Sequence, residues 1–207
     1  MNGSHCLAVA CLISAVVGCS SASIRYYTLT PPPDRTSARA NTTLAIDVRV
    51  IHTPPQLSRT ELMVRASPTE VVLLDNERWA SSVKDEIKDA LRLALQRRLG
   101  DLTDLRSAIP KLTVTVDVQH FEAELGRYAL VETTWSLAVP HMGAGADEPQ
   151  AVTCTFRADE KIAAGYAAMV NGYQRDIAAL ADAIVAELKR RASGVGAACG
   201  QTDGSYG

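Results

Sequence analysis

The chain has 207 residues, of which 21 are Lys or Arg and 23 are Asp or Glu, so its formal net charge is −2. Such a balance lacks the basic field that attracts nucleic acid, and we expect no nucleic-acid partner. A hydrophobic content of 47% is typical of a folded globular protein and excludes a wholly disordered chain. A chain of this length accommodates one domain of ordinary size.

The chain starts with a small, apolar segment. An unbroken run of small and apolar residues extends from Cys6 to Val17, after Met1–His5, which contains no Lys or Arg. As a helix this run would be roughly 18 Å long, whereas the hydrocarbon core of a bilayer is about 30 Å thick. The run is too short for an ordinary transmembrane helix and has the length of a signal-peptide core, although signal peptides usually start with positive charge.

The apolar run ends in Val16-Val17-Gly18-Cys19, which resembles a bacterial lipobox. This motif predicts a signal peptide over residues 1–18, cleavage before Cys19, and a lipidated Cys19 with a tether over residues 19–24. Ser20 stands where lipoproteins of the inner membrane usually carry Asp, which favours the outer membrane. The alternatives are an ordinary signal peptide with a coincidental cysteine, or a buried N-terminal helix.

Strand patterns dominate the next stretch. Residues 25–29 are rich in β-formers and stop at Pro31, and a polar loop follows over residues 34–43. Residues 44–51 alternate in part and predict a strand that ends before Pro54. Residues 61–66 and 70–74 predict two short strands on either side of Pro68, as in a hairpin.

A helix is predicted over residues 79–99, and Gly100 is placed to stop it. Its apolar residues recur every three or four positions, and they are Val83, Ile87, Leu91, Ala94, Leu95 and Leu99. A second helix is predicted over residues 166–191. Its apolar stripe consists of Met169, Val170, Tyr173, Ile177, Leu180, Ile184, Val185 and Leu188.

Three further strands are predicted between the helices, by alternation of apolar and polar residues. Their apolar positions are Leu112, Val114, Val116 and Val118, then Val131, Thr133, Trp135, Leu137 and Val139, then Val152, Cys154 and Phe156. The order predicts an α+β fold, a mostly antiparallel sheet with two amphipathic helices packed on one face. We assign the domain to residues 25–192 and predict a disordered tail over residues 193–207.

Only Cys154 and Cys199 remain once the signal and lipobox are set aside. Export would permit a disulfide between them. Alternation with Val152 and Phe156 instead favours Cys154 as a small apolar core residue, with Cys199 in the tail. The pairing stays open at this point.

The sequence provides no support for an enzyme or a metal site. His52, His120 and His141 lie in different segments, and none is at metal-ligand spacing with another His or Cys. Nucleophile-elbow, P-loop and dinucleotide motifs are absent from the sequence. The acidic pairs Asp147-Glu148 and Asp159-Glu160 are interpreted as solvated turns on loops. We therefore expect no catalytic residue, metal or cofactor.

Tyr26, Tyr27 and Trp79 are the candidates for partner contact, because aromatic side chains often anchor interfaces. The alternative is that they belong to the core, with Trp79 packing the start of the first helix against the sheet. The apolar stripes of the helices are interpreted as core.

Three features of the chain occur together: the lipobox, Tyr26-Tyr27-Thr28-Leu29 with prolines after it, and Arg78-Trp79-Ala80-Ser81-Ser82-Val83. In this combination the chain resembles the PqiC/YmbA family of ABC-type transport auxiliary lipoproteins. The resemblance covers residues 23–191. It implies a non-catalytic outer-membrane lipoprotein that faces the periplasm, self-associates and works with an MCE-domain protein in lipid transport and envelope integrity. Two rival hypotheses are a lipid-binding carrier and a structural lipoprotein of outer-membrane assembly.

Overall fold

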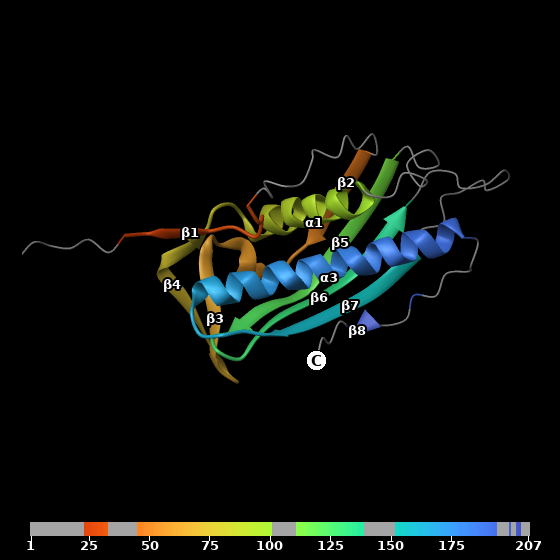
Figure 1. Cartoon of the computed structure of the whole chain (residues 1–207). Coiled ribbons are helices and arrows are strands. Elements are labelled where there is room, and N and C mark those ends of the chain that lie inside the picture. Colours follow the sequence, from red (N-terminus) through yellow and green to blue (C-terminus); the bar gives the residue numbers. More distant parts are fainter. Residues whose placement is uncertain are drawn as a thin grey trace, which may run out of the picture.

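The computed structural model describes residues 23–32, 45–100, 111–138, 152–193, 199 and 202–203. Figure 1 shows the arrangement of their helices and strands. The elements are β1 (Arg25–Tyr27), β2 (Ala45–His52), the 3-10 helix η1 (Pro55–Ser58), β3 (Glu61–Ser67), β4 (Glu70–Trp79), α1 (Val83–Gly100), β5 (Lys111–Glu124), β6 (Tyr128–Ala138), β7 (Val152–Lys161), α3 (Tyr166–Ala192) and β8 (Thr202–Asp203). The predicted α+β class is confirmed.

The described strands form two sheets, a three-stranded one of order β1-β4-β3 and a five-stranded one of order β2-β5-β6-β7-β8. Strands that follow one another directly pair antiparallel, as in β3–β4, β5–β6 and β6–β7. The more distant pairs β1–β4, β2–β5 and β7–β8 are parallel. The mostly antiparallel character is confirmed, whereas the division into two sheets and the parallel pairs were not predicted.

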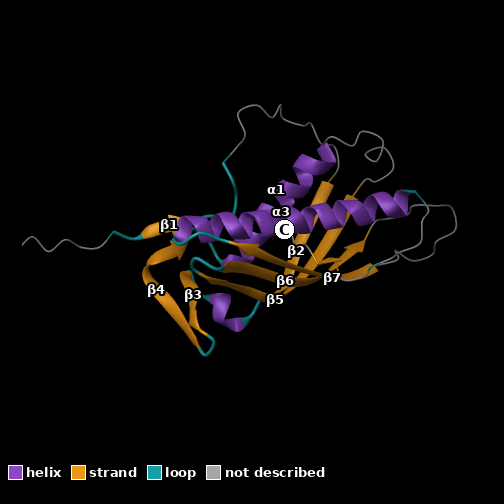
Figure 2. Ribbon diagram, turned by 60° about the horizontal axis from the view of Figure 1, so that its bottom comes forward, coloured by secondary structure: helices purple, strands orange, loops and turns teal. Residues whose placement is uncertain are grey.

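Both long helices lie on the same side of the five-stranded sheet (Figure 2). Helix α1 contacts β2 and α3, and α3 contacts β6 and β7. Every predicted stripe residue is buried except Ala94, which is partly buried against the same core. The prediction of two amphipathic helices on one face is therefore confirmed.

The first helix begins four residues later than predicted. Trp79 is the last residue of β4, and α1 starts at Val83. The Ser82 hydroxyl oxygen accepts a hydrogen bond from the Asp85 backbone N–H at 3.1 Å, and the hydroxyl donates to the Asp85 carboxylate at 2.7 Å. Ser82 therefore caps the N-terminus of α1. Trp79 is buried in the core, but it lies in β4 and not in the helix.

Strand β5 extends beyond its predicted end because its pairing with β6 shifts register. The shift lies between Val118 and His120. Before it, Val114, Val116 and Val118 are buried, and after it the buried residues are Phe121 and Ala123. One extra residue therefore restores the apolar face after the bulge, which simple alternation could not predict.

Close approach of α3 to the sheet requires a glycine. A Cβ at Gly172 would lie 2.6 Å from Ile162 Cγ2 and 3.0 Å from Ala129 Cβ. Both distances are shorter than normal contacts, so the helix could not lie as close with alanine at this position.

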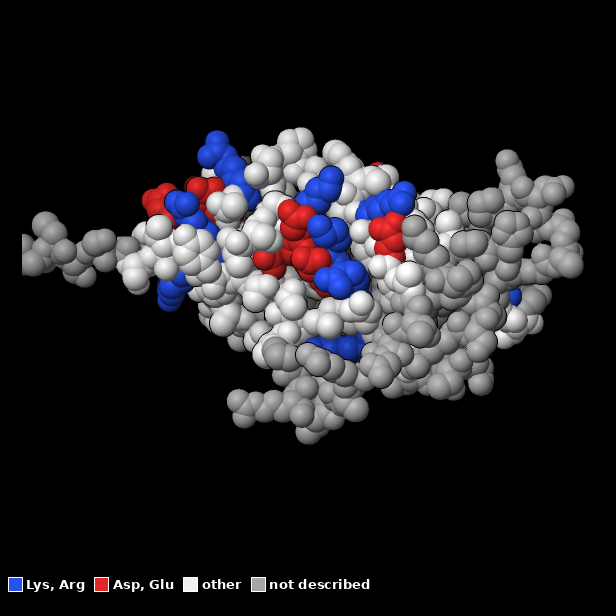
Figure 3. Space-filling model, turned by 90° about the horizontal axis from the view of Figure 1, so that it is seen from above, with Lys and Arg blue, Asp and Glu red and all other residues white. Residues whose placement is uncertain are grey.

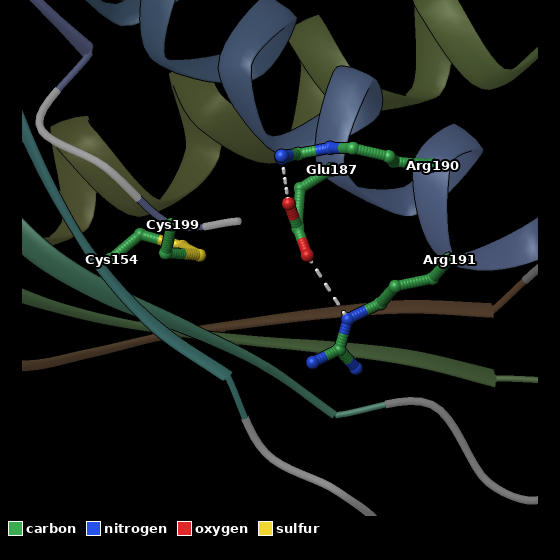
Figure 4. Close-up of a disulfide and its surroundings, with 5 residues drawn as sticks. All are labelled: Cys154, Glu187, Arg190, Arg191 and Cys199. Carbon is green, nitrogen blue, oxygen red and sulfur yellow. Dashed lines mark hydrogen bonds and ion pairs between the residues drawn. A yellow bond between two sulfur atoms is a disulfide. The ribbon is translucent and has the colours of Figure 1, made fainter. Parts of the chain in front are cut away.

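A disulfide joins Cys154 of β7 to Cys199, with Cα atoms 5.1 Å apart (Figure 4). The interpretation of Cys154 as an unpaired core residue is therefore wrong, although its side chain is buried. Part of the tail predicted to be disordered is ordered, because Thr202 and Asp203 form β8 beside Phe156 and Arg157. The rest of residues 194–207 lies outside the described residues.

The end of α3 near this disulfide carries a buried carboxylate. Glu187 accepts hydrogen bonds from Arg190 and, at 3.2 Å, from Arg191 Nε (Figure 4). These arginines neutralise the acid within the last turns of the helix, where cations also interact favourably with the helix dipole.

A salt bridge fastens the β3–β4 hairpin to the large sheet. Arg65 of β3 donates to both carboxylate oxygens of Glu122 in β5, one at 2.5 Å, and the Tyr128 hydroxyl donates to Glu122 at 2.9 Å. The Arg65 hydrogen bond lowers the pKa of Glu122 below its usual value, and the Tyr128 bond adds to this, although burial opposes both. The ionised form of Glu122 is therefore the one the fold stabilises.

We expect Cys199→Ser to lower the free energy of unfolding by about 2–4 kcal/mol, since the bond closes a loop across a sequence separation of 45 residues. Chemical denaturation of oxidised protein measures the loss. Reduced wild-type protein is the control and should match the variant. Equal midpoints for oxidised and reduced wild type, or no linked Cys154–Cys199 peptide on mass mapping, would contradict the disulfide.

We expect Glu122→Gln to lower the melting temperature at pH 7 by about 2–4 °C, because a charge-assisted hydrogen bond is lost. A depressed folded pKa contributes stability above the unfolded pKa, and this stability is lost as pH falls through the folded pKa. The difference from wild type should therefore shrink at pH 3. Glu70→Gln, an exposed change on the same hairpin, is the control, and a difference that persists at pH 3 would argue against the ionic tie.

Candidate functional site

The three aromatic candidates are brought together by the pairing of β1 with β4. Tyr26 lies beside Arg78, and Tyr27 lies beside Trp79. Their side chains differ in exposure, because Tyr26 is 64% exposed, Tyr27 is half-buried and Trp79 is 3% exposed. Of these three residues, only Tyr26 has a mostly exposed side chain that a partner could contact.

Trp79 belongs to an aromatic cluster between the helices and the sheet. Its ring lies 6.1 Å from that of Phe121 and 6.2 Å from that of Tyr173. The Phe121 and Tyr173 rings stack with their centroids 3.9 Å apart. This placement agrees with the core alternative for Trp79, so Trp79 does not enter the surface considered below.

The segment directly after β1 is held by one buried carboxylate. Glu86, in the first turn of α1, accepts hydrogen bonds from the Thr28 hydroxyl, the Leu29 backbone N–H and the Ser81 hydroxyl, each 2.8 Å long. Leu29 is fully buried beside it. Glu86 was not predicted as a functional residue. The available signal was an acidic residue near the start of the predicted helix, on the side of its apolar stripe.

Two more contacts fix β1 itself. Glu77 of β4 accepts a hydrogen bond from Arg25 Nε at 2.8 Å, and the Tyr27 ring meets the Tyr166 ring edge-on. Burial raises the pKa of Glu77, but the hydrogen bond from Arg25, with Tyr27 nearby, outweighs burial and leaves it lowered. The backbone is also joined, because the Ala80 N–H donates to the Tyr27 carbonyl at 2.7 Å. The chain is thus firmly held within six residues of Cys19.

Exposed apolar side chains gather on the small sheet. We define the β1–β4 surface by five exposed residues. They are Ile24, which precedes β1, Tyr26 in β1, and Val71, Val72 and Leu73 in β4. In the described sheet, β1 covers only Glu77–Trp79, so one edge of β4 is open over residues 70–76. Figure 1 shows β1, β3 and β4 at one end of the molecule. The two groups lie toward opposite ends of β4, because Tyr26 pairs with Arg78 whereas Val71–Leu73 lie beside the turn between β3 and β4. Exposed apolar residues beside an open strand edge are typical of interaction sites.

Charged side chains show no comparable segregation on the face drawn in Figure 3, where basic and acidic groups lie side by side. Along α1, Lys88 pairs with Asp85 at 2.7 Å and Arg92 with Asp89 at 3.4 Å. These charges are therefore neutralised locally.

The histidines do not form a site in the part of the chain that the structure describes. His52 is exposed at the end of β2, and His120 in β5 lies 3.2 Å from the Glu132 carboxylate with more than half of its side chain exposed. His141 and Asp147-Glu148 lie outside the described residues. Asp159-Glu160 lies in β7, so its assignment to a loop is wrong, because the strand continues past its alternating apolar residues.

The described residues contain neither a metal-binding cluster nor a membrane-spanning helix. They contain no group of three or more His, Cys, Asp or Glu side chains that could hold a metal ion. They also contain no helix that is long and apolar enough to cross a membrane.

Comparisons with known proteins place this geometry in a family. One crystal structure of an uncharacterized protein is similar to this chain with a TM-score of 0.60 and 20% identity, covering 80% of this chain and 99% of the other. The crystal structure of protein XCC0632 from Xanthomonas campestris, described as DUF330, has a TM-score of 0.54 and 16% identity, covering 79% and 92%. At these identities the likeness concerns the fold. No curated protein sequence matches.

The model of the family described as "ABC-type transport auxiliary lipoprotein component" matches residues 27–185. This range begins inside β1 and ends inside α3, so it includes both described sheets apart from the first residues of β1 and the short β8. The chain belongs to the family of ABC-type transport auxiliary lipoprotein components.

Proposed function

We propose that this protein is a lipid-anchored, non-catalytic component of an ABC-type transport system. In this proposal the acyl chains on Cys19 lie in the outer membrane, the domain faces the periplasm, and an MCE-domain protein is the partner. The observation that carries the proposal is the fixation of residues 25–29 by Glu77 and Glu86. These residues begin six positions after the lipobox cysteine, so the fold fixes the segment to which the short tether is joined.

The tether limits how far the domain can lie from the bilayer. Arg25 lies six positions after Cys19, and an extended chain spans at most about 3.3–3.6 Å per residue. The start of β1 would thus lie within about 20 Å of the anchored cysteine. Ile24 and Tyr26 are exposed in this zone, so the partner that they contact meets the domain close to the membrane.

The β1–β4 surface is the proposed contact for the MCE-domain partner. It combines an exposed tyrosine, which resembles the aromatic anchors of interfaces, with an open strand edge that a partner strand could extend. The Arg65–Glu122 salt bridge holds the hairpin in place. Self-association of the domain through the same or another edge is part of the proposal.

The carrier hypothesis requires a larger apolar space. Three of the hollows lined by described residues have volumes of about 270, 160 and 70 Å³, each below the about 300–1,000 Å³ of typical ligand pockets. Between the helices and the sheet, the Trp79, Phe121 and Tyr173 rings occupy the core. This favours association as the function, with lipid co-purification as the result that would restore the carrier hypothesis.

We expect Cys19→Ser to leave a folded but unanchored protein, because two acyl chains supply about 0.8 kcal/mol for each buried CH₂ group. Membrane fractionation of cells that express the variant should show soluble or unprocessed protein, whereas wild type should fractionate with the outer membrane. A processed variant that still fractionates with the outer membrane would contradict the lipid anchor.

We expect Tyr26→Ser to weaken binding to the periplasmic part of the cognate MCE-domain protein at least fivefold, as loss of an aromatic anchor does. Biolayer interferometry with the full chain in detergent measures the affinity. The matched control is Ile51→Ser, which removes an exposed apolar side chain from β2 in the other sheet. Equal affinities for the two variants would place the contact elsewhere.

A further inference from the structure

Helix α3 carries a buried carboxylate that has no hydrogen-bond partner among the residues the structure describes. Asp176 is 1% exposed. Neither Asp176 Oδ1 nor Asp176 Oδ2 accepts a hydrogen bond among the described residues. A buried polar group of this kind normally has a partner, because burial without one is costly. The location of Asp176 next to a surface hollow suggests what the missing partner is.

The hollow has a volume of about 270 Å³ and lies between α3 and β7. Its wall consists of Ala158 and Glu160 from β7 with Arg175, Asp176, Ala178, Ala179 and Asp182 from α3. Three of these residues are alanines, whose methyl groups make an apolar passage. The edge of β7 is open here, because β8 pairs only with Phe156 and Arg157 in the described part of the sheet.

The charged residues around the hollow are already matched. Arg175 Nε donates to Glu160 at 2.8 Å, and Arg98 NH2 donates to Asp182 at 2.8 Å. These pairs neutralise the rim and leave Asp176 as its unsatisfied acid. Any cation that satisfies Asp176 without breaking them must come from outside.

We propose that the hollow is a binding site for an arginine side chain of a partner protein, with the guanidinium group on Asp176. Two unpartnered oxygens on one carboxylate fit the two parallel N–H groups of a guanidinium fork, a geometry that a lysine ammonium does not match. The alanine wall suits the aliphatic stem of arginine, which can lie on apolar surface while its head reaches a charge. This site is separate from the β1–β4 surface and does not depend on the lipid anchor.

Without a partner arginine, the buried Asp176 carboxyl group should lower the stability of the folded protein. Burial raises the pKa of Asp176 to about 8, with Glu160 and Asp159 adding to the effect and Arg175 opposing it. Between the usual pKa and this value the folded state binds one proton more than the unfolded state, so stability falls as pH rises. Asp176→Asn removes this cost and should raise the melting temperature at pH 7.5.

The test uses the full chain in detergent and N-acetyl-arginine amide as the probe, followed by two-dimensional NMR at pH 7.5. We expect saturable shifts at residues around the hollow and at least tenfold weaker binding to Asp176→Asn. N-acetyl-citrulline amide, which has the same shape without the charge, should bind at least tenfold more weakly than the arginine probe. Asp75→Asn makes the same change of charge at an exposed position of β4 in the other sheet and should bind the arginine probe as wild type does.

Three results would overturn the proposal. The first is the absence of saturable shifts with the arginine probe. The second is equal binding to wild type and Asp176→Asn, which would place the guanidinium elsewhere. The third is a lower melting temperature of Asp176→Asn, which would show that Asp176 already has a structural partner in solution, such as a rearranged Arg175.

Discussion

Burial of one apolar face of the five-stranded sheet is the constraint on which the rest of this structure depends. Strands β5, β6 and β7 each carry apolar residues on one side, from Leu112 to Phe156, and the helices cover that side. The apolar area removed from water supplies most of the driving force for folding. The opposite side of β7 carries exposed polar residues such as Thr153, Thr155 and Arg157, so the sheet needs only one covering layer.

The same core organises the attachment end. Trp79 ends β4 inside the aromatic cluster with Phe121 and Tyr173. Ser81, in the turn after it, donates to Glu86 at the start of α1, and Glu86 binds the N-terminal segment. Because Glu86 is buried, its carboxylate requires donors, and Thr28 and Leu29 supply them. A force on the proposed anchor would therefore be transmitted to α1 and β4 through hydrogen bonds, with few intervening residues.

Two groups of residues depart from ordinary packing. Val71, Val72 and Leu73 expose apolar side chains to water, and Asp176 buries a carboxyl group without a hydrogen-bond partner among the described residues. Each costs stability in the isolated chain, and proteins keep such costs where function requires them. Val71, Val72 and Leu73 lie on a strand with an open edge, and Asp176 of α3 lines a hollow beside β7.

The sequence by itself determined the helix stripes, the main strands and the α+β class, because periodicity is a local property that burial on one face imposes on the residues. It also pointed to Tyr26 as a contact residue. Only the tertiary structure decided the parallel pairs β1–β4 and β2–β5, the bulge after Val118, the burial of Trp79 and the Cys154–Cys199 bond. These features depend on which distant segments of the chain come into contact. The residues next to Glu86 and Asp176 in the sequence do not predict which side chains contact them in the fold.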